Sequence, residues 1–431
     1  MNRSALAVTV VFLFGACTVD AESEGEVAQG AGSDPAIGSP LLLLGKVIDG
    51  DGAPVPRATV SVGDSFTTTA PDGWFDLQVP AAGRVSVGKP GWVGTEIDWE
   101  GSSDVVRVAI EPIRVRGLRV GGGAAGDDAQ FAALLALADE TAINTLAFDT
   151  KQEGGRVLYD TSVAAAHEWG AVVKAYDPAE RIAQAREQDL YLITRIVTFE
   201  DWFWAKARPE LAFEGPWINP TITSAWEYPL ALADEACALG FDEIQFDYVR
   251  FPSGSTVETS GQLDMTQAER VGAIEGFLEA ARQRLHSEGC AVSADVFGII
   301  LATENDQGIG QRPEELTRHL DAFSPMVYPS HYSDGWLGFE DPNEHPYDVT
   351  TDAIEDGLAR IQPGVVLRPW LQAFWWTDEQ IRRSIQAAED QDVGWILWNA
   401  VSNFSRAAIP TDAEIGPATG LSSTSPSTPT P

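Results

Sequence analysis

Hydrophobic and polar positions alternate in two different ways along the 431-residue chain. Between residues 41 and 112 the apolar segments are short and are separated by turns. Strand candidates run from Ala58 to Val62 and from Trp74 to Val79, and Asp51-Gly52 and Asp72-Gly73 are typical turn pairs. This spacing predicts a small all-β sandwich over residues 41–112.

From residue 113 onward the pattern changes to apolar strand candidates that are each followed by a helical or loop-rich segment. The candidates begin at residues 113, 144, 190, 242, 290, 322, 366 and 394. Strands alternating with helices predict a parallel sheet, and eight such units over about 300 residues predict a closed (β/α)8 TIM barrel, an α/β fold, over residues 113–409. Residues 268–289 are predicted as one outer helix that stops at Gly289.

A doubly wound open sheet is the competing topology for the same alternation. It would need a glycine-rich phosphate-binding turn after its first strand. Residues 120–128, VGGGAAGDD, lack the spacing of that fingerprint. The closed barrel is therefore the predicted architecture.

Both ends of the chain have the composition of processing and linker segments. Residues 1–17 carry one Arg, an apolar stretch and small residues before Cys17, which predicts a secretory signal too short to span a bilayer permanently. The ending resembles a bacterial lipobox, although Phe14 stands where Leu is usual. We expect lipidation at Cys17, with plain cleavage as the alternative. Residues 18–40 and 410–431 are predicted as an acidic linker and a Ser/Thr/Pro tail without a core.

These ends predict a secreted or cell-envelope lipoprotein, at the bacterial outer surface or in the periplasm, anchored to the membrane if Cys17 is lipidated. The chain has 64 acidic and 28 basic residues, a formal charge of -36. Such a field repels phosphate backbones, so we expect no nucleic-acid partner, although the same charge also suits a merely solvated surface. Cys237 and Cys290 form either one bridge or two buried thiols, and we favour the thiols.

Charged residues interrupt the buried strand pattern of residues 240–252, GFDEIQFDYVRFP. Active sites of barrel enzymes lie at the carboxyl ends of the strands, where polar side chains face the ligand. Similar polar positions follow the other strands, so that the set comprises Asp149, Lys151, Arg195, Asp247, Arg250, Asp295, Tyr328, His331, Gln372 and Asn399. Their convergence predicts an active site, although a structural ion pair such as Asp247 with Arg195 is the alternative for any one of them.

The residue types at these positions narrow the chemistry. The five histidines are scattered without a metal-ligand spacing, and neither a nucleophile elbow nor a Cys-His pairing is present, so we expect no metal and no cofactor. Carboxylates and aromatic residues remain, and glycoside hydrolysis uses two carboxyl groups. The long loop after the third strand holds Trp202, Trp204, Trp217 and Trp226, and Trp375, Trp376 and Trp398 follow later strands. A carbohydrate is therefore the predicted substrate.

Several runs of sequence carry a family resemblance: FDEIQFDYVRFP, RIVTFEDWFWAKARPE, SADVFG, IGQRPEEL, SPMVYPSHY, RPWLQAF and WILWNA. Over about residues 113 to 405 the chain resembles the putative glycoside hydrolase family catalogued as domain of unknown function 4015. The resemblance implies a TIM-barrel, glycosidase-like domain. Residues 41–112, with G-x-V-x-D-x-x-G-x-P and T-x-x-D-G-x-F patterns, resemble the carboxypeptidase-regulatory-like module, which is mostly a spacer or a weak binding platform.

One local comparison bears on the mechanism. Asp247, at the end of the fourth strand, resembles the nucleophilic aspartates of several retaining barrel glycosidases. Val249 and Arg250 stand where the chitinase-type pattern carries its acidic Glu. Substrate-assisted chitin chemistry is therefore not expected.

The hypothesis from the sequence is a glycoside hydrolase acting on a polysaccharide or cell-wall glycan. Asp247 is predicted as nucleophile or charge stabiliser, Asp295 as acid/base and Asp149 as a reserve carboxylate. Glu200, Asp201 and Glu304 are further acid candidates. The predicted substrate-binding residues are Lys151, Arg195, Trp202, Trp217, Arg250, Tyr328, His331, Gln372, Trp375, Trp398 and Asn399. A non-catalytic glycan-binding barrel is the main alternative, and a structural envelope protein is the third.

Overall fold

The structure, a computed structural model, describes residues 40–213, 215–254 and 261–417. The predicted signal segment with Cys17, nearly all of the predicted linker, and residues 418–431 of the predicted tail lie outside the described residues. Residues 410–417 of that tail are described and include a short helix, Asp412–Ile415. Among the described helices, none is both long and apolar enough to cross a bilayer.

The first part of the described chain is all-β, as predicted. One sheet has the strand order β4-β1-β8, a second has the order β3-β2-β5-β7, and β6 pairs with β9. The pairs are antiparallel except β1 with β8. The strands are β1 Leu41–Ile48, β2 Thr59–Val62, β3 Ser65–Thr68, β4 Trp74–Val79, β5 Gly83–Gly88, β6 Trp92–Val93, β7 Thr95–Trp99, β8 Val106–Ala109 and β9 Glu111–Pro112.

Strand β4 shows how the sequence pattern makes this sandwich. Its residues alternate strictly between exposed and buried, and Phe75, Leu77 and Val79 enter a core that is separate from that of the barrel. The predicted turn before it is present, with Gly73 at a φ of +78°. A Cβ atom there would lie 2.5 Å from the carbonyl oxygen of Val47, so only glycine fits this turn.

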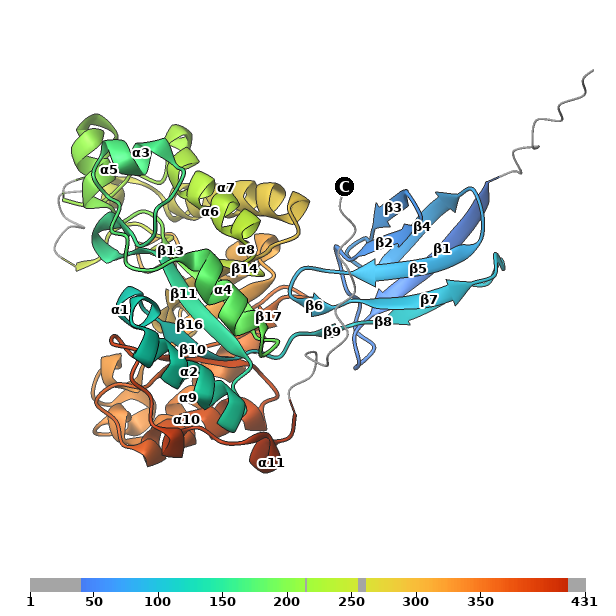
Figure 1. The fold of residues 1–431 in the computed structure, drawn as a ribbon. Helices are drawn as coiled ribbons and strands as arrows, with labels where there is room; N and C mark the ends of the chain where they lie inside the picture. The colour runs from blue at the N-terminus through green and yellow to red at the C-terminus, as the bar shows by residue number, and fades with distance from the viewer. Residues whose placement is uncertain (1–39, 214, 255–260, 418–431) are drawn as a thin grey trace, which may run out of the picture. The chain divides into compact units, whose positions relative to one another are not determined.

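The second part is a closed parallel barrel of eight strand positions, which confirms the prediction (Figure 1). The order is β10-β19-β18-β16-β15-β14-β13-β11, and β10 also pairs with β11, which closes the ring. Short β17 pairs with β16, and β12 returns antiparallel to β11. The strands are β10 Arg116–Val120, β11 Thr145–Gln152, β12 Arg156–Val157, β13 Tyr191–Val197, β14 Glu243–Asp247, β15 Ala291–Phe297, β16 Ala322–Val327, β17 Val366–Leu367, β18 Trp370–Gln372 and β19 Trp395–Trp398.

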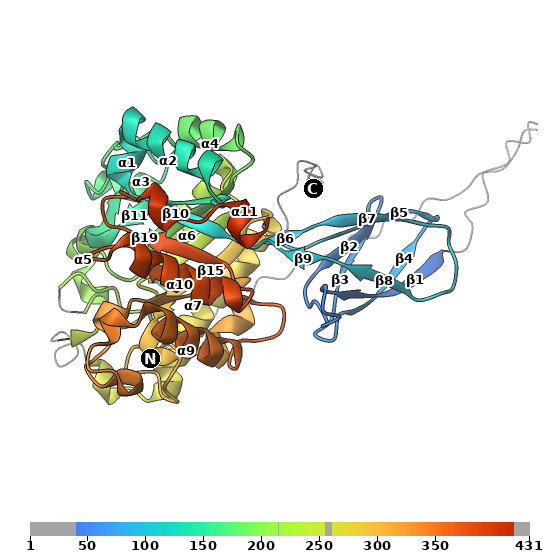
Figure 2. The same cartoon turned by 90° about the horizontal axis from the view of Figure 1, so that it is seen from below.

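Helices cover the outside of these strands, as Figure 2 shows for α2, α4, α7, α9 and α10. They are α1 Gly122–Gly126, α2 Asp128–Glu140, α3 Ala164–Glu168, α4 Pro178–Arg186, α5 Trp202–Ala207, α6 Glu227–Leu239, α7 Gln267–Ser287, α8 Pro313–Leu316, α9 Pro346–Leu358, α10 Asp378–Asp390 and α11 Asp412–Ile415. The predicted outer helix corresponds to α7. It begins at a capping box of Thr266 and Glu269 and ends before Gly289, whose φ is +88°.

Alternation along the barrel strands decides which side chains reach the interior. On β13, Leu192 and Ile196 point outward into the core under the helices, whereas Tyr191 and Ile193 belong to a small cluster inside the barrel. Arg195 is the next inward position. Polar residues near the carboxyl ends of the strands are thus directed to one common space.

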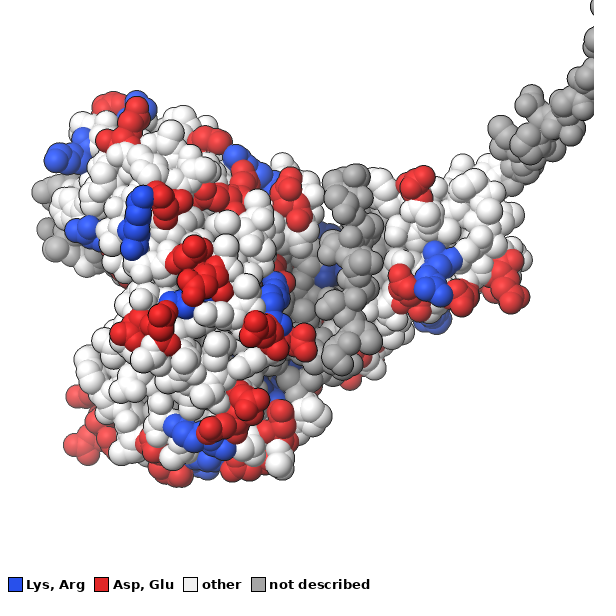
Figure 3. All heavy atoms as spheres, viewed as in Figure 1, with Lys and Arg blue, Asp and Glu red and all other residues white. Residues whose placement is uncertain are grey.

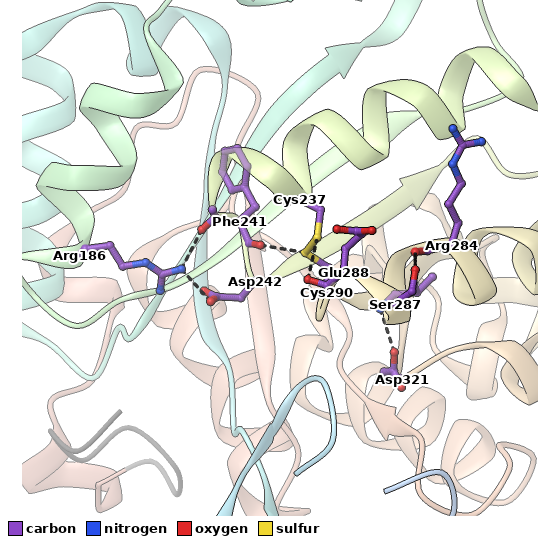
Figure 4. Close-up of a disulfide and its surroundings, with 11 residues drawn as sticks. Arg186, Cys237, Phe241, Asp242, Arg284, Ser287, Glu288, Cys290 and Asp321 are labelled. Atoms are coloured by element: carbon purple, nitrogen blue, oxygen red, sulfur yellow. Dashed lines mark hydrogen bonds and ion pairs between the residues drawn. A yellow bond between two sulfur atoms is a disulfide. The ribbon is translucent and has the colours of Figure 1, made fainter. Parts of the chain in front are cut away.

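Cys237 and Cys290 form a disulfide, with a Cα–Cα distance of 6.0 Å, so the expectation of two free thiols was wrong (Figure 4). The bond joins the last turn of α6 to the residue before β15. It lies at the amino ends of β14 and β15, next to Asp242, whose carbonyl accepts a hydrogen bond from the Ala291 amide. Only the fold brings the end of α6 to this point, because 53 residues separate the cysteines.

Acidic residues outnumber basic residues by 64 to 28 in the sequence. On the face drawn in Figure 3, acidic side chains lie across the described regions with basic side chains among them. No continuous basic stripe of the kind that binds nucleic acid is visible on that face.

Candidate active site

Arg195 is the centre of the candidate site. Its side chain is 1% exposed, and its guanidinium contacts carboxylates from the neighbouring strands on both sides. Nη1 lies 3.3 Å from Oδ1 of Asp149 on β11, and Nε lies 2.8 Å from Oδ2 of Asp247 on β14 and 3.7 Å from Oδ2 of Asp295 on β15. Nη2 pairs with Glu153, just after β11. We call these five residues the Arg195 cluster.

The backbone after β14 fixes the direction of Asp247. Tyr248 has a φ of +48°, an unfavourable conformation for a residue with a bulky side chain. In this conformation its amide donates a hydrogen bond of 2.6 Å to Oδ1 of Asp247. Backbone strain of this kind is concentrated at functional sites, where the surrounding structure stabilises it.

A second guanidinium, that of Arg119, contacts the cluster. Nη2 of Arg119, on β10, lies 2.5 Å from Oδ2 of Asp149, and its Nη1 donates to the carbonyl oxygen of Ala400 at 2.9 Å. The guanidiniums of Arg119 and Arg195 lie 4.3 and 4.9 Å from the ring centre of Trp398. Trp398, predicted to bind substrate, therefore borders the cluster and packs against both cations.

Asp295 has an environment unlike that of the other carboxylates. Burial, and next the negative charge of Asp247, raise its pKa well above the ordinary value, against the opposing effect of Arg195. Its Oδ1 accepts a hydrogen bond of 2.6 Å from Nε1 of Trp370. The pKa of Tyr328 is also raised well above its ordinary value, by burial and by the charges of Asp295 and Asp247.

Glu153 behaves in the opposite way. Although burial would raise its pKa, the adjacent Arg195 lowers the pKa of Glu153 to about 2. The cluster thus contains one carboxyl group that favours the protonated form and another that stays ionised. Such a separation is the condition for assigning acid and base roles to neighbouring carboxyl groups.

Arg250 and Trp217 pack against each other. The Arg250 guanidinium lies 4.7, 4.9 and 4.5 Å from the ring centres of Trp217, Tyr248 and Phe297, and Nη1 donates to the Phe251 carbonyl oxygen at 2.9 Å. Burial lowers the pKa of Arg250 to about 10. Both side chains are buried, so in this structure they support the loop beyond Asp247 more than they face a ligand.

Lys151 does not join the Arg195 cluster. The register of β11 against β13 shifts between Asp149 and Lys151, and Nζ lies 2.8 Å from Oδ2 of Asp201 and 2.6 Å from the Val197 carbonyl oxygen. Neither side chain of the ion pair is exposed. Asp201 also caps α5 by accepting from the Trp204 amide at 2.8 Å. This geometry indicates that the ion pair of Lys151 and Asp201 has a structural role. It does not support ligand binding by Lys151 or acid catalysis by Asp201.

Gln372 and Asn399 connect the loops around the site. Oε1 of Gln372 accepts from the Ser330 amide at 3.2 Å, and its Nε2 donates to the Phe374 carbonyl oxygen at 3.1 Å. Nδ2 of Asn399 donates to the Ala373 carbonyl oxygen at 2.8 Å. The two amides therefore hold the segments after β16, β18 and β19 in place.

The remaining aromatic candidates divide by exposure. Trp202 and Trp375 are 56% and 85% exposed, whereas Trp204 is buried. Trp375 also has a φ of +61°. His331 packs edge to face on Tyr328, with ring centres 5.4 Å apart, and burial lowers the pKa of His331. Trp202 and Trp375 thus have free ring surface that could contact a sugar.

Two further acid candidates lie at different places. Oε2 of Glu200 accepts from the Gly154 amide at 2.6 Å, next to Glu153, and burial raises the pKa of Glu200. Glu304 lines a hollow of about 520 Å³ together with Arg312 and Arg360, and this hollow includes no member of the Arg195 cluster. Glu200 therefore remains near the candidate chemistry, and Glu304 does not.

Sequence reasoning missed three residues that the structure brings to the site: Arg119, Glu153 and Trp370. A signal existed for Arg119, because a charge interrupts the strand RGLRV as Asp247 interrupts its own. The sequence gives no such signal for the other two residues. Glu153 lies in the loop that follows Lys151, and the sequence around Trp370 is typical of an ordinary core residue. No group of three or more His, Cys, Asp or Glu side chains within the described ranges is arranged to hold a metal ion. The cation between these carboxylates is Arg195.

One protein family and several solved structures are similar to this chain. The family described as "Putative glycosyl hydrolase domain" matches residues 117–404. The PgaB (BpsB) glycoside hydrolase domain from Bordetella bronchiseptica is 11% identical over 67% of this chain and 95% of its own, with a TM-score of 0.50, a likeness of fold. A hypothetical protein from Ruminiclostridium thermocellum is 33% identical over 42% of this chain and 99% of its own, with a TM-score of 0.37.

The spore cortex-lytic enzyme SleL from Bacillus megaterium is 11% identical over 73% of this chain and 76% of its own, with a TM-score of 0.43. No curated protein matches. The family match covers more than half of the sequence and includes all the strands that carry the Arg195 cluster. This chain belongs to the putative glycosyl hydrolase domain family and contains its TIM-barrel glycoside hydrolase domain.

Proposed function

We propose that the barrel cleaves a glycosidic bond in a polysaccharide or cell-wall glycan, with Asp247 as nucleophile and Asp295 as acid/base. The observation that carries this proposal is that both carboxyl groups approach the same nitrogen, Nε of Arg195, and that burial and the charge of Asp247 raise the pKa of Asp295 well above its ordinary value. A protonated acid beside a carboxylate paired with a cation is the arrangement that glycoside hydrolysis needs.

The spacing favours a retaining reaction. Because the Oδ2 atoms of Asp247 and Asp295 lie 2.8 and 3.7 Å from one nitrogen, they are at most about 6.5 Å apart, the lower limit for inverting enzymes. Inverting enzymes need room for a water molecule between sugar and base. Retaining enzymes place the two carboxyl groups roughly 5 to 5.5 Å apart.

The roles follow from this spacing. In the first step Asp247 attacks the anomeric carbon and the bond to the leaving oxygen breaks, while Asp295 gives its proton to that oxygen. In the second step Asp295, now a carboxylate, takes a proton from water as the water oxygen displaces Asp247 from the anomeric carbon. Arg195 supplies the positive charge beside both groups. Asp149, held between Arg119 and Arg195, orients the two guanidiniums.

The same proposal includes an extracytoplasmic location. A disulfide between Cys237 and Cys290 fits an oxidising compartment, in agreement with the secretory signal predicted at residues 1–17. The lipid anchor at Cys17 remains a prediction from the sequence.

The test is hydrolysis of a panel of polysaccharides and cell-wall glycans by the wild-type chain and by Asp247→Asn and Asp295→Asn. We expect reducing ends to be released by the wild type, with kcat reduced by roughly three orders of magnitude or more in either variant, and products that retain the anomeric configuration. Azide should restore turnover of an activated substrate by the Asp295 variant. Asp306→Asn is a matched control, because Asp306 is a buried partner of Arg270 away from the cluster.

The outcomes separate the alternatives. Glycan binding without released reducing ends would favour the non-catalytic binding barrel. Full activity of Asp247→Asn would remove Asp247 from the mechanism, and inverted products would exclude it as a nucleophile.

A further inference from the structure

Trp370 lies inside the barrel and contacts the candidate acid, Asp295. It is the first residue of β18, is 1% exposed, and belongs to the interior apolar cluster with Ile193 and Ile396. Its ring packs edge to face against Trp398, with centres 5.3 Å apart. The indole is therefore held by packing on several sides, and its Nε1 donates to Oδ1 of Asp295 at 2.6 Å.

We propose that Trp370 is a positioning residue that fixes which oxygen of Asp295 carries the catalytic proton. This inference rests on the proposed acid/base role of Asp295. An indole nitrogen can only donate a hydrogen bond, so the oxygen it contacts must be an acceptor. The carbonyl oxygen of a carboxylic acid is a better acceptor than its hydroxyl oxygen, so the indole favours the form in which Oδ1 is unprotonated and the acidic proton lies on Oδ2.

The position of Oδ2 determines where the acidic proton of Asp295 points. Oδ2 is the oxygen that lies toward Arg195, 3.7 Å from its Nε, and Asp247 contacts the same nitrogen. Trp370 therefore directs the proton of the acid into the space that it shares with the nucleophile. Without the indole donor, the hydrogen bond that favours protonation of Oδ2 over Oδ1 is lost.

Trp370 also acts on the second step. Burial and the charge of Asp247 raise the pKa of Asp295, and the indole hydrogen bond opposes that rise because it stabilises the carboxylate. Asp295 must lose its proton in the first step and take one up in the second. A donor that stays in place through both steps keeps the buried carboxylate hydrogen-bonded while it is charged.

The test replaces Trp370 with benzothienylalanine, which keeps the bicyclic shape and puts sulfur in place of the N–H group. We expect kcat to fall at least about tenfold with little change in KM. We also expect the basic limb of the pH profile to move to higher pH, because the pKa of Asp295 rises further when the donor is lost. Trp370→Phe should move the limb in the same direction.

Trp395 provides a matched control. It is also fully buried, and its Nε1 donates to a carboxylate oxygen, Oε1 of Glu389, at 2.8 Å, outside the Arg195 cluster. Benzothienylalanine at position 395 should lower stability without moving the pH profile. Equal shifts in both variants, or an unchanged profile and kcat in the Trp370 variant, would overturn the proposal.

A spectroscopic readout separates this proposal from the proposed function. The indole ¹H–¹⁵N resonance of Trp370, assigned by its loss in Trp370→Phe, should titrate with pH in the wild type and lose that titration in Asp295→Asn. If the wild type cleaves no glycan but this titration is present, the proposed function fails while the coupling of Trp370 to Asp295 stands. If the pH titration of this resonance is the same in Asp295→Asn as in the wild type, the coupling of Trp370 to Asp295 is refuted.

Discussion

Arg195 and Asp247 form a two-point contact, with Nε and Nη2 of the guanidinium 2.8 and 2.6 Å from the same carboxylate oxygen, Oδ2. The pair is nearly excluded from water, with side chains 1% and 6% exposed. In such surroundings each charge depends on its partner, because an unpaired buried charge is costly. Arg195 also contacts Asp149 and Asp295, so its replacement affects the whole cluster.

Arg195→Met should therefore lower the free energy of unfolding by about 3 to 5 kcal/mol, since it leaves buried carboxylates without a cation. Arg195→Lys keeps one positive charge but cannot contact Asp247 through two nitrogens while reaching Asp149. We expect Arg195→Lys to retain more stability than Arg195→Met and to lose at least about 100-fold in kcat/KM. Urea unfolding and initial rates measure the two effects, and wild-type kinetics of Arg195→Lys would exclude a role for the guanidinium fork.

The raised pKa of Asp295 predicts a dependence of stability on pH. Below about pH 4 the carboxyl group is protonated in both the folded and the unfolded chain. As the pH rises above the unfolded value, the unfolded chain releases this proton while the folded chain keeps it, so this group's contribution to stability falls. Asp295→Asn removes the effect. The variant should match the wild type near pH 3.5 and become the more stable protein toward pH 7.

Asp306→Asn should change the pH dependence of stability in the opposite direction. Burial would raise the pKa of Asp306, but its hydrogen bonds and ion pair with Arg270 lower it. Its contribution to stability is therefore present at neutral pH and is lost as the pH falls through the lowered pKa. Urea unfolding of both variants between about pH 3.5 and 7 tests the two signs together. Asp295→Asn less stable than the wild type at pH 7 would contradict the raised pKa.

The sequence predicts the barrel well because its signals are local. Each strand is a short apolar run, each helix has its own start and stop, and a charge inside a buried strand, as at Asp247 or Asp295, marks a position at the carboxyl end. These features depend on the period of the secondary structure and on the general rule that barrel sites lie at one end. The convergence of Asp149, Arg195, Asp247 and Asp295 follows from them.

The finer arrangement depends on features that no local pattern carries. A register shift after Asp149 moves Lys151 out of the cluster and pairs it with Asp201, 50 residues later. The sequence pattern predicts only that Trp370 is a core residue. Its contact with Asp295 depends on how far β15 and β18 are shifted along the barrel axis relative to each other. The disulfide likewise depends on where α6 ends relative to β15. Each is a relationship between distant segments.

Lys151 tests whether the buried pair is structural. Lys151→Met leaves the carboxylate of Asp201 buried and unpaired, so we expect a loss of about 3 to 5 kcal/mol in the free energy of unfolding. The double variant Lys151→Met/Asp201→Asn should recover part of that loss, because no charge is then left unpaired. We expect the kcat of the folded fraction to stay within about threefold of the wild-type value. A large rise in KM with stability preserved would instead support substrate binding by Lys151.

The disulfide should contribute stability without contributing to turnover. Its 53-residue loop restricts the unfolded chain, and loops of this length correspond to about 4 kcal/mol in the chain-entropy treatment, with about 2 to 4 kcal/mol typically measured. The bond lies at the amino ends of β14 and β15, whereas Asp247 and Asp295 lie at or near the carboxyl ends of the same strands. Cys237→Ala/Cys290→Ala should therefore unfold at lower urea concentration while the kcat measured well below the transition is unchanged. Reduction of the wild type should reproduce the shift, and a reductant should not affect the double variant. A fall in kcat under conditions where the double variant is fully folded would show that the amino ends of these strands influence the candidate site.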